Sequence, residues 1–226
     1  MIQVIPAILP HHFEDLTEHL GAVRSLSRAV QIDVVDGIFA PNRTWPYTDA
    51  ASFERILSEE EGMPFWEDFD FELDLMVEKS KDAALQWVRA GASRIIIHAE
   101  SPDDKAALVA LQEYREGEGA IDVGVAISPL TPDEKLESLI EYVSFIQVMG
   151  IEKVGFQGSP QWDGTAGRVH ALREKYPGTL ISVDGGVTLG TARTLADAGA
   201  SRLVVGSGVF AHNPKEALRE FADVLS

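Results

Sequence analysis

An apolar run followed by a helix-like segment recurs eight times along the chain, and this repetition limits the possible folds more than any other feature. The runs are continuous rather than alternating, which is typical of parallel strands covered by helices. The predicted strands are Ile2–Leu9, Val30–Val34, Phe71–Met76, Ser93–His98, Ile121–Ile127, Val143–Met149, Ile181–Val183 and Leu203–Val205.

Each predicted strand is followed by a segment with helical periodicity or helix start and stop signals. These predicted helices are Phe13–Leu26, Asp49–Ser58, Ser80–Ala90, Asp103–Tyr114, a segment after Pro132 that ends at Ile140, Thr165–Lys175, Thr191–Ala198 and Pro214–Leu225. Eight strand–helix pairs without a linker predict an α/β fold, a single TIM (β/α)8 barrel domain over residues 1–226.

The alternative architecture is an open doubly wound sheet, which would need a glycine fingerprint after the first strand. Pro6 and Pro10 occupy that region instead, and the glycine loops come last, so the barrel is favoured. A cluster of acidic residues at about 58–70 precedes the third strand, and we interpret it as a solvated surface insertion.

Composition restricts the partners and the chemistry. The 226 residues carry a formal net charge of −17 and include no cysteine. This charge disfavours nucleic acid and anionic membranes as partners, and thiolate nucleophiles and thiolate metal sites are absent. The first ten residues lack the features of a signal peptide, and no apolar run reaches membrane-spanning length, so we expect a cytoplasmic protein.

Two consecutive predicted strands near the C-terminus end in glycine turns. Asp184-Gly185-Gly186 follows the seventh strand, and Gly206-Ser207-Gly208 follows the eighth. Glycine lets the main chain approach a ligand, and the last two such loops of a barrel commonly bind phosphate. Two ordinary tight turns are the alternative interpretation, but their consecutive positions at strand ends favour a phosphate site made of neutral N–H groups.

Acidic side chains also gather at the predicted strand ends, where barrel enzymes place their chemistry. Asp36, directly before Gly37, is expected to cap a turn. Asp33 and Asp184 lie inside apolar strands, where an ionised carboxylate is costly unless it is paired or used. Asp74 ends the third strand and His98 the fourth.

The sequence resembles the ribulose-phosphate 3-epimerase family over its whole length. The resemblance rests on PAILPHHF, QIDVVDGIFAPN, ELDLM, IIIHAE, VMGIEKVGFQG, VDGGV and VVGSGVF, which occur in the family's order and at about its spacing. VDGG or GSGVF alone is shared with many phosphate-binding barrels, whereas the ordered set is specific.

The resemblance implies an isomerase that epimerises a ketose phosphate, as in the interconversion of ribulose 5-phosphate and xylulose 5-phosphate. A proton next to the carbonyl is removed, an enediolate forms, and a proton returns on the opposite face. It implies that Asp33 and Asp184 are the catalytic acid and base, that the partner is a small phosphorylated sugar, and that the chain forms a homo-oligomer. The implied substrate and phosphate site consists of Met76, His98, Met149, Gly155, Gly158, Gly185, Gly186, Gly206 and Ser207.

The family also binds a divalent metal through two histidines and two aspartates, and here the sequence departs from it. The positions of the two histidines hold Gln31 and Asp74, and an early substrate-binding serine is Ala7. In one interpretation Gln31, Asp33, Asp74 and Asp184 form an all-oxygen site for magnesium or manganese.

In the other interpretation the metal is lost and a protein cation replaces it, with Lys153 and Arg43 as candidates. Metal loss is favoured because glutamine is a poor replacement for imidazole.

Two other functions remain open on this fold. One is another sugar-phosphate isomerase or an aldolase, although no predicted strand core contains the lysine that a Schiff-base aldolase needs. The other is an inactive homologue that binds a phosphorylated ligand without converting it.

Overall fold

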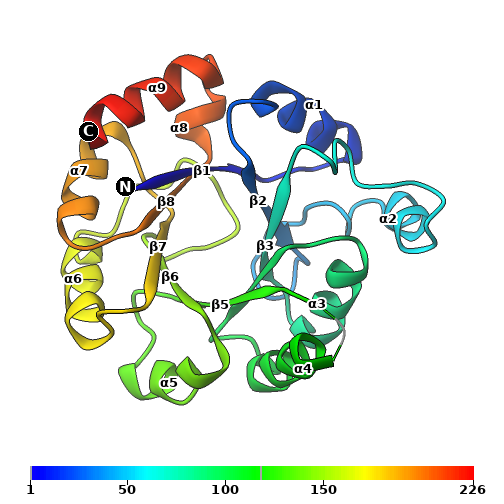
Figure 1. Cartoon of the computed structure of the whole chain (residues 1–226), viewed down its shortest axis with the longest axis horizontal. Helices are drawn as coiled ribbons and strands as arrows, with labels where there is room; N and C mark the ends of the chain where they lie inside the picture. The colour runs from blue at the N-terminus through cyan, green and yellow to red at the C-terminus, as the bar shows by residue number, and fades with distance from the viewer. Residues whose placement is uncertain (1, 118) are drawn as a thin grey trace.

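The chain forms a closed barrel of eight parallel strands that follow one another in sequence order, surrounded by helices (Figure 1). The computed structural model describes residues 2–117 and 119–226. The predicted TIM barrel is therefore confirmed. Its strands are β1 (Gln3–Ile8), β2 (Ala29–Val35), β3 (Asp70–Met76), β4 (Arg94–His98), β5 (Asp122–Ile127), β6 (Phe145–Met149), β7 (Leu180–Asp184) and β8 (Arg202–Val205).

The helices follow the predicted order with changed bounds. They are α1 (Phe13–Val23), α2 (Ala50–Leu57), α3 (Ser80–Arg89), α4 (Asp104–Gly117), α5 (Asp133–Glu137), the 3-10 helix η1 (Ile140–Tyr142), α6 (Thr165–Lys175), α7 (Leu189–Asp197), α8 (Ser207–Phe210) and α9 (Pro214–Leu225). None of the helices in residues 2–117 and 119–226 is long and apolar enough to cross a membrane.

Three boundaries differ from the sequence-based expectation for identifiable reasons. Helix α1 ends at Val23, before the predicted Leu26, because Ser25 adopts a positive φ of 65° that a helix cannot contain. The helix predicted to reach Ile140 breaks into α5 and η1. The second glycine turn continues directly into the short helix α8, which the sequence did not indicate.

The acidic segment before β3 is a loop of turns that joins α2 to β3. Trp66 is 64 % exposed, while Met63 and Phe69 are buried in the main core. Two exposed salt bridges, Arg24–Asp68 and Arg28–Asp70, tie the loop to the end of α1 and the start of β2. The segment is thus anchored by apolar side chains and keeps most of its acidic groups exposed.

The main core lies between the barrel and its helices and takes alternate residues of each strand. In β2, for example, Val30, Ile32 and Val34 belong to this core, whereas Gln31 and Asp33 lie on the inward face. The expectation of continuous apolar strands was therefore wrong for the inward face. That face buries polar side chains from most strands, namely Gln31, Asp33, Glu72, Asp74, His98, Gln147, Ser182, Asp184 and Arg202.

A buried ion pair lies inside the barrel toward its N-terminal end. Arg202 on β8 donates to Glu72 on β3 at 2.6 Å, and their side chains are 2 % and 0 % exposed. Arg202 also donates to Ser182 and lies over the ring of Phe145. Since a buried charge without its partner is strongly destabilising, this pair is expected to make the lower barrel sensitive to single substitutions.

We expect Arg202→Met to lower the free energy of unfolding by about 3–5 kcal/mol, because it leaves the Glu72 carboxylate buried without its main partner. Arg28→Met, at the exposed Arg28–Asp70 pair, should cost under about 1 kcal/mol. Urea unfolding of both variants measures the difference. Equal losses would contradict the assigned role of the buried pair.

Candidate active site

The candidate active site lies at the C-terminal ends of the strands, and strand register brings its residues together. Asp33 on β2 is aligned with Asp74 on β3, and Met149 on β6 is aligned with Asp184 on β7. Oxygens of Asp33, Asp74 and Asp184 lie within 4.8 Å of one another. The barrel thus brings Asp33 and Asp184 together although they lie far apart in the sequence.

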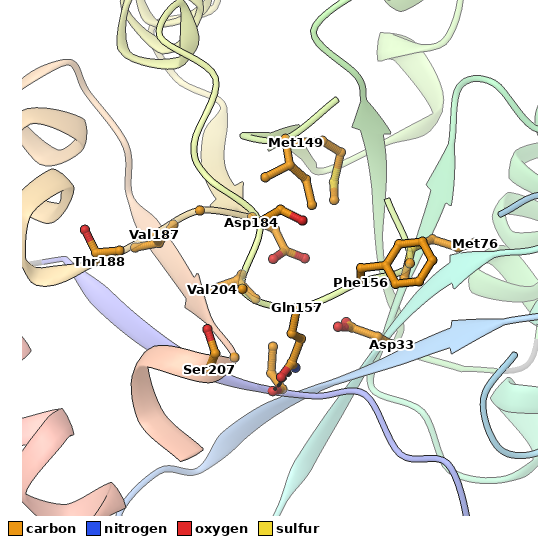
Figure 2. A pocket seen from close by; sticks show the side chains of 18 residues that line it. Asp33, Met76, Met149, Phe156, Gln157, Asp184, Val187, Thr188, Val204 and Ser207 are labelled. Atoms are coloured by element: carbon orange, nitrogen blue, oxygen red, sulfur yellow. Dashed lines mark hydrogen bonds between the residues drawn. The ribbon is translucent and has the colours of Figure 1, made fainter. Parts of the chain in front are cut away.

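One cavity of about 150 Å³ holds most of the predicted site residues. Its volume is below the roughly 300–1,000 Å³ of pockets for drug-sized ligands, which fits a small substrate. In Figure 2 the carboxyl groups of Asp33 and Asp184 point toward each other across this cavity. The predicted residues that line it are Asp33, Met76, Met149, Gly155, Gly158, Asp184, Gly185, Gly186, Gly206 and Ser207.

Three predicted residues do not line this cavity. His98, predicted to meet the substrate, lines a neighbouring hollow with Phe39, whose ring centroid lies 5.1 Å from its own. Gln31 and Asp74 are fully buried beneath the cavity floor. The structure thus separates residues that border the cavity from residues that support its floor.

The two glycine turns form one wall of the cavity. Gly185 and Gly186 have φ values of 94° and 68°, which favour glycine, and Gly206 precedes the first turn of α8. The first N–H groups of a helix have no partner within the helix, and Gly206 and Ser207 at the start of α8 and Thr188 before α7 line the cavity. No lysine or arginine of the described chain lines the cavity, so an anion there would be held by neutral groups.

The loop of residues 150–161, called the covering loop below, closes the cavity. Its Gln157 donates to the carbonyl of Ala7 on β1 at 3.1 Å, and its Gly155 carbonyl accepts from Asn42 at 2.7 Å. A Cβ on Gly186 would lie 2.5 Å from the backbone of Gln161. The loop is therefore packed directly on the glycine wall, and Gln157 is a cavity residue that the sequence analysis did not identify.

The carboxyl groups of Asp33 and Asp184 are joined by a glutamine amide. The Gln31 amide nitrogen donates to Asp33 Oδ1 at 2.8 Å and to Asp184 Oδ2 at 2.7 Å. Burial, and next the charges of Asp184 and Asp74, raise the pKa of Asp33 well above its usual value. Burial and the charge of Asp74 raise the pKa of Asp184 to about 7, against the hydrogen bond from Gln31. Such a pair keeps one proton near neutral pH.

Asp74 is engaged by a different partner. His98 Nε2 lies 3.0 Å from Asp74 Oδ1, and His98 Nδ1 lies 3.6 Å from Glu100 Oε2. Burial alone would lower the pKa of His98, but the charge of Asp74 and the hydrogen bonds to both carboxylates raise it to about 10. His98 is thus a buried imidazolium beside Asp74 at neutral pH.

The structure corrects the two sequence-based candidates for a protein cation. Lys153 and Arg43 are both exposed, and Arg43 donates to the carbonyl of Asp36 at 3.4 Å. Asp36 caps its turn as expected, since its carboxylate accepts from the backbone N–H groups of Ile38 and Phe39. The buried cation beside the acidic cluster is instead His98. The sequence analysis predicted His98 only as a residue that contacts the substrate.

Paired acidic groups that face a glycine-lined cavity at the C-terminal end of a (β/α)8 barrel are typical of enzymes that bind small anionic substrates. The Ribulose-phosphate 3 epimerase family matches residues 3–210, and the chain belongs to this family. Relatives named ribulose-phosphate 3-epimerase, an isomerase, are similar over nearly the full length. The protein of Candida glabrata is 33 % identical, covering 95 % of this chain and 89 % of its own. That of Schizosaccharomyces pombe is 30 % identical, covering 96 % and 90 %.

Solved structures show the same fold at low sequence identity. A 3-hexulose-6-phosphate synthase covers 100 % of both chains with a TM-score of 0.71 and 17 % identity. KGPDC from Streptococcus mutans covers 100 % of this chain and 97 % of its own, with a TM-score of 0.69 and 16 % identity. These likenesses support the barrel architecture alone.

The divalent metal implied by the family does not fit this donor set as it is arranged. Oxygens of Asp33, Asp74 and Asp184 lie within 4.8 Å of one another, which is close enough for three ligands. The Gln31 group that faces Asp33 and Asp184, however, is the amide nitrogen, a donor without a lone pair for a metal. The third carboxylate, Asp74, is already paired with His98.

Gly186→Ala is predicted to weaken anion binding by about tenfold or more, because φ is 68° and the new Cβ would meet the Gln161 backbone at 2.5 Å. Calorimetric titration with inorganic phosphate measures this change. Gly190→Ala is the matched control, since its Cβ would meet only Thr188 Oγ1 at 3.7 Å. Equal affinity in both variants would place the anion elsewhere.

Asp184→Asn should be more stable than the unmodified chain above pH 7. The folded pKa of Asp184, about 7, exceeds the ordinary value of 3.8, so its ionisation costs stability as pH rises from about 4 to about 7. Since one pKa unit equals about 1.4 kcal/mol, the gain is a few kcal/mol at most.

Denaturant unfolding between pH 4 and pH 8 tests this expectation, with the exposed Asp197→Asn as control. A stability difference that does not grow with pH for Asp184→Asn would show that its carboxyl is not perturbed.

Proposed function

We propose that this chain epimerises a ketose phosphate by moving protons through Asp33 and Asp184. The observation that carries the proposal is that both carboxyl groups face one cavity whose wall consists of two glycine turns. The family, whose relatives are named ribulose-phosphate 3-epimerase, supports a pentulose 5-phosphate as the substrate. In this proposal the turns at Gly185–Gly186 and Gly206–Ser207 hold the phosphate.

The protonation states of the pair suit a two-base reaction. Burial raises the pKa of both carboxyl groups, so the pair holds one proton near neutral pH. In this proposal Asp33 carries that proton and Asp184 acts as the base. Asp184 takes the proton from the carbon next to the carbonyl, and the electron pair of that C–H bond forms the enediolate. Asp33 then delivers its proton to the other face of the same carbon, and the electron pair returns to a new C–H bond.

The shape of the cavity supports the separation of the two faces. Asp33 comes from β2 and Asp184 from β7, and Figure 2 shows their carboxyl groups entering the cavity from different directions. Met76 and Met149 line the cavity between them with thioether groups that cannot be acids or bases. The reacting carbon therefore meets ionisable groups only where a proton has to leave or arrive.

The alternative activities gain no specific support. A Schiff-base aldolase needs a lysine at the substrate, and no lysine of the described chain lines the cavity. A protein that only binds a phosphorylated ligand has no need for two buried carboxyl groups facing each other, which cost stability when ionised.

Asp184→Asn is expected to abolish the exchange of the substrate proton with solvent deuterium, since an amide cannot accept that proton. Asp33→Asn should also block epimerisation, because the proton cannot be returned to the opposite face. Nuclear magnetic resonance of ribulose 5-phosphate in deuterium oxide follows both reactions.

Circular dichroism and phosphate binding serve as controls that the fold and the glycine wall persist. Continued exchange in Asp184→Asn would refute the proposed function.

A further inference from the structure

We infer that two buried glutamine amides hold the paired carboxyl groups of this chain in the place of a divalent metal ion, and that its reaction proceeds without one. The chemical part of this inference rests on the proposed function. The structural part, which concerns Gln31, Gln147 and the carboxyl groups, does not.

Gln31 is the centre of the arrangement. Its side chain is fully buried, and its amide nitrogen donates one hydrogen to Asp33 and the other to Asp184. Its oxygen Oε1 has no hydrogen-bond partner among the described residues, although it is buried too. Both N–H groups of the amide therefore bind carboxyl groups while its oxygen stays without a partner. The two donated hydrogen bonds are what holds the side chain in this orientation.

Gln147 on β6 adds a second amide. It is fully buried, and its nitrogen lies 3.4 Å from the same Asp184 oxygen that accepts from Gln31. Hydrogen bonds from two neutral amides favour the charged form of a carboxyl group. Asp184, the proposed base, therefore faces two amide donors, whereas Asp33 accepts from Gln31.

Each carboxyl group of the acidic cluster already has a partner within the protein. His98 Nε2 lies 3.0 Å from Asp74 Oδ1, and the Gln31 amide nitrogen donates to both Asp33 and Asp184. The Gln147 amide nitrogen lies 3.4 Å from Asp184. These contacts engage the three carboxyl groups whose oxygens lie within 4.8 Å of one another.

A metal ion that bridged Asp33 and Asp184 would meet the positive ends of the Gln31 N–H groups. For Gln31 to become a ligand, its amide would have to turn, and both carboxyl groups would lose their donors at 2.7–2.8 Å. Histidine at the same position would offer a ring nitrogen with a lone pair and no second donor to the pair. The residue at position 31 therefore determines whether Asp33 and Asp184 face an amide donor or a nitrogen that can bind a metal.

Metal uptake tests this inference independently of the reaction. The unmodified chain and Gln31→His are incubated with MnCl₂ or ZnCl₂ and desalted, and their metal content and unfolding temperature are measured. The unmodified chain should retain well under one equivalent and show no shift, whereas Gln31→His should retain about one equivalent of zinc and unfold at a higher temperature. Gln3→His, at an exposed position of β1, controls for an added surface histidine.

Stoichiometric, stabilising manganese or zinc in the unmodified chain would overturn the inference. So would the absence of metal from Gln31→His, because Gln31 would then not be what excludes the ion. If Gln31→His does not fold, Gln31→Glu takes its place, since it replaces the amide nitrogen with an oxygen ligand and should retain manganese.

Proton exchange with and without a chelator completes the test. Exchange into ribulose 5-phosphate should proceed at the same rate in both conditions, and loss of exchange on chelation with recovery on adding metal would also overturn the inference. A chain that binds no metal and catalyses no exchange would refute the proposed function but leave the amide-held pair intact, so the two failures are distinguishable.

Discussion

The structure depends on the burial of two acidic side chains that face each other in one cavity. Asp33 and Asp184 are only 7 % and 8 % exposed, and like charges at this distance cannot both be ionised at low cost. The barrel tolerates the pair because other inward-facing side chains lie beside it. Gln31 and Gln147 supply hydrogen-bond donors, and His98 supplies a cation next to Asp74. Strand register thus also determines which inward-facing side chains lie next to the acidic groups, as it aligns Asp33 with Asp74 and Met149 with Asp184.

The fold could be predicted from the sequence because its signal is repeated. Eight apolar runs and their helices predict a barrel even when individual boundaries are off, as at α1 and α5. The glycine turns and the inward aspartates could be predicted as well, because two consecutive strands end in glycine turns and because an aspartate inside an apolar strand is costly unless it is paired or used.

The hydrogen bonds beneath the cavity could not be predicted. The sequence indicated Gln31 only as a possible metal ligand and gave no signal for Gln147, and their common partner Asp184 lies 153 and 37 positions away. The Arg202–Glu72 pair spans 130 positions. Such contacts depend on which layer of the barrel each side chain enters, and layer assignment requires the strand register.

The bridging amide has a consequence for turnover. Proton transfer in one direction leaves Asp184 protonated and Asp33 ionised, the inverse of the starting state, and this inverted pair is the one that the reverse reaction needs. Gln31 gives one hydrogen to each carboxyl group, at 2.8 and 2.7 Å, so the ionised member keeps a donor in both states. The second amide, Gln147, contacts only Asp184, so the support is not symmetrical and stabilises an ionised Asp184 more than an ionised Asp33.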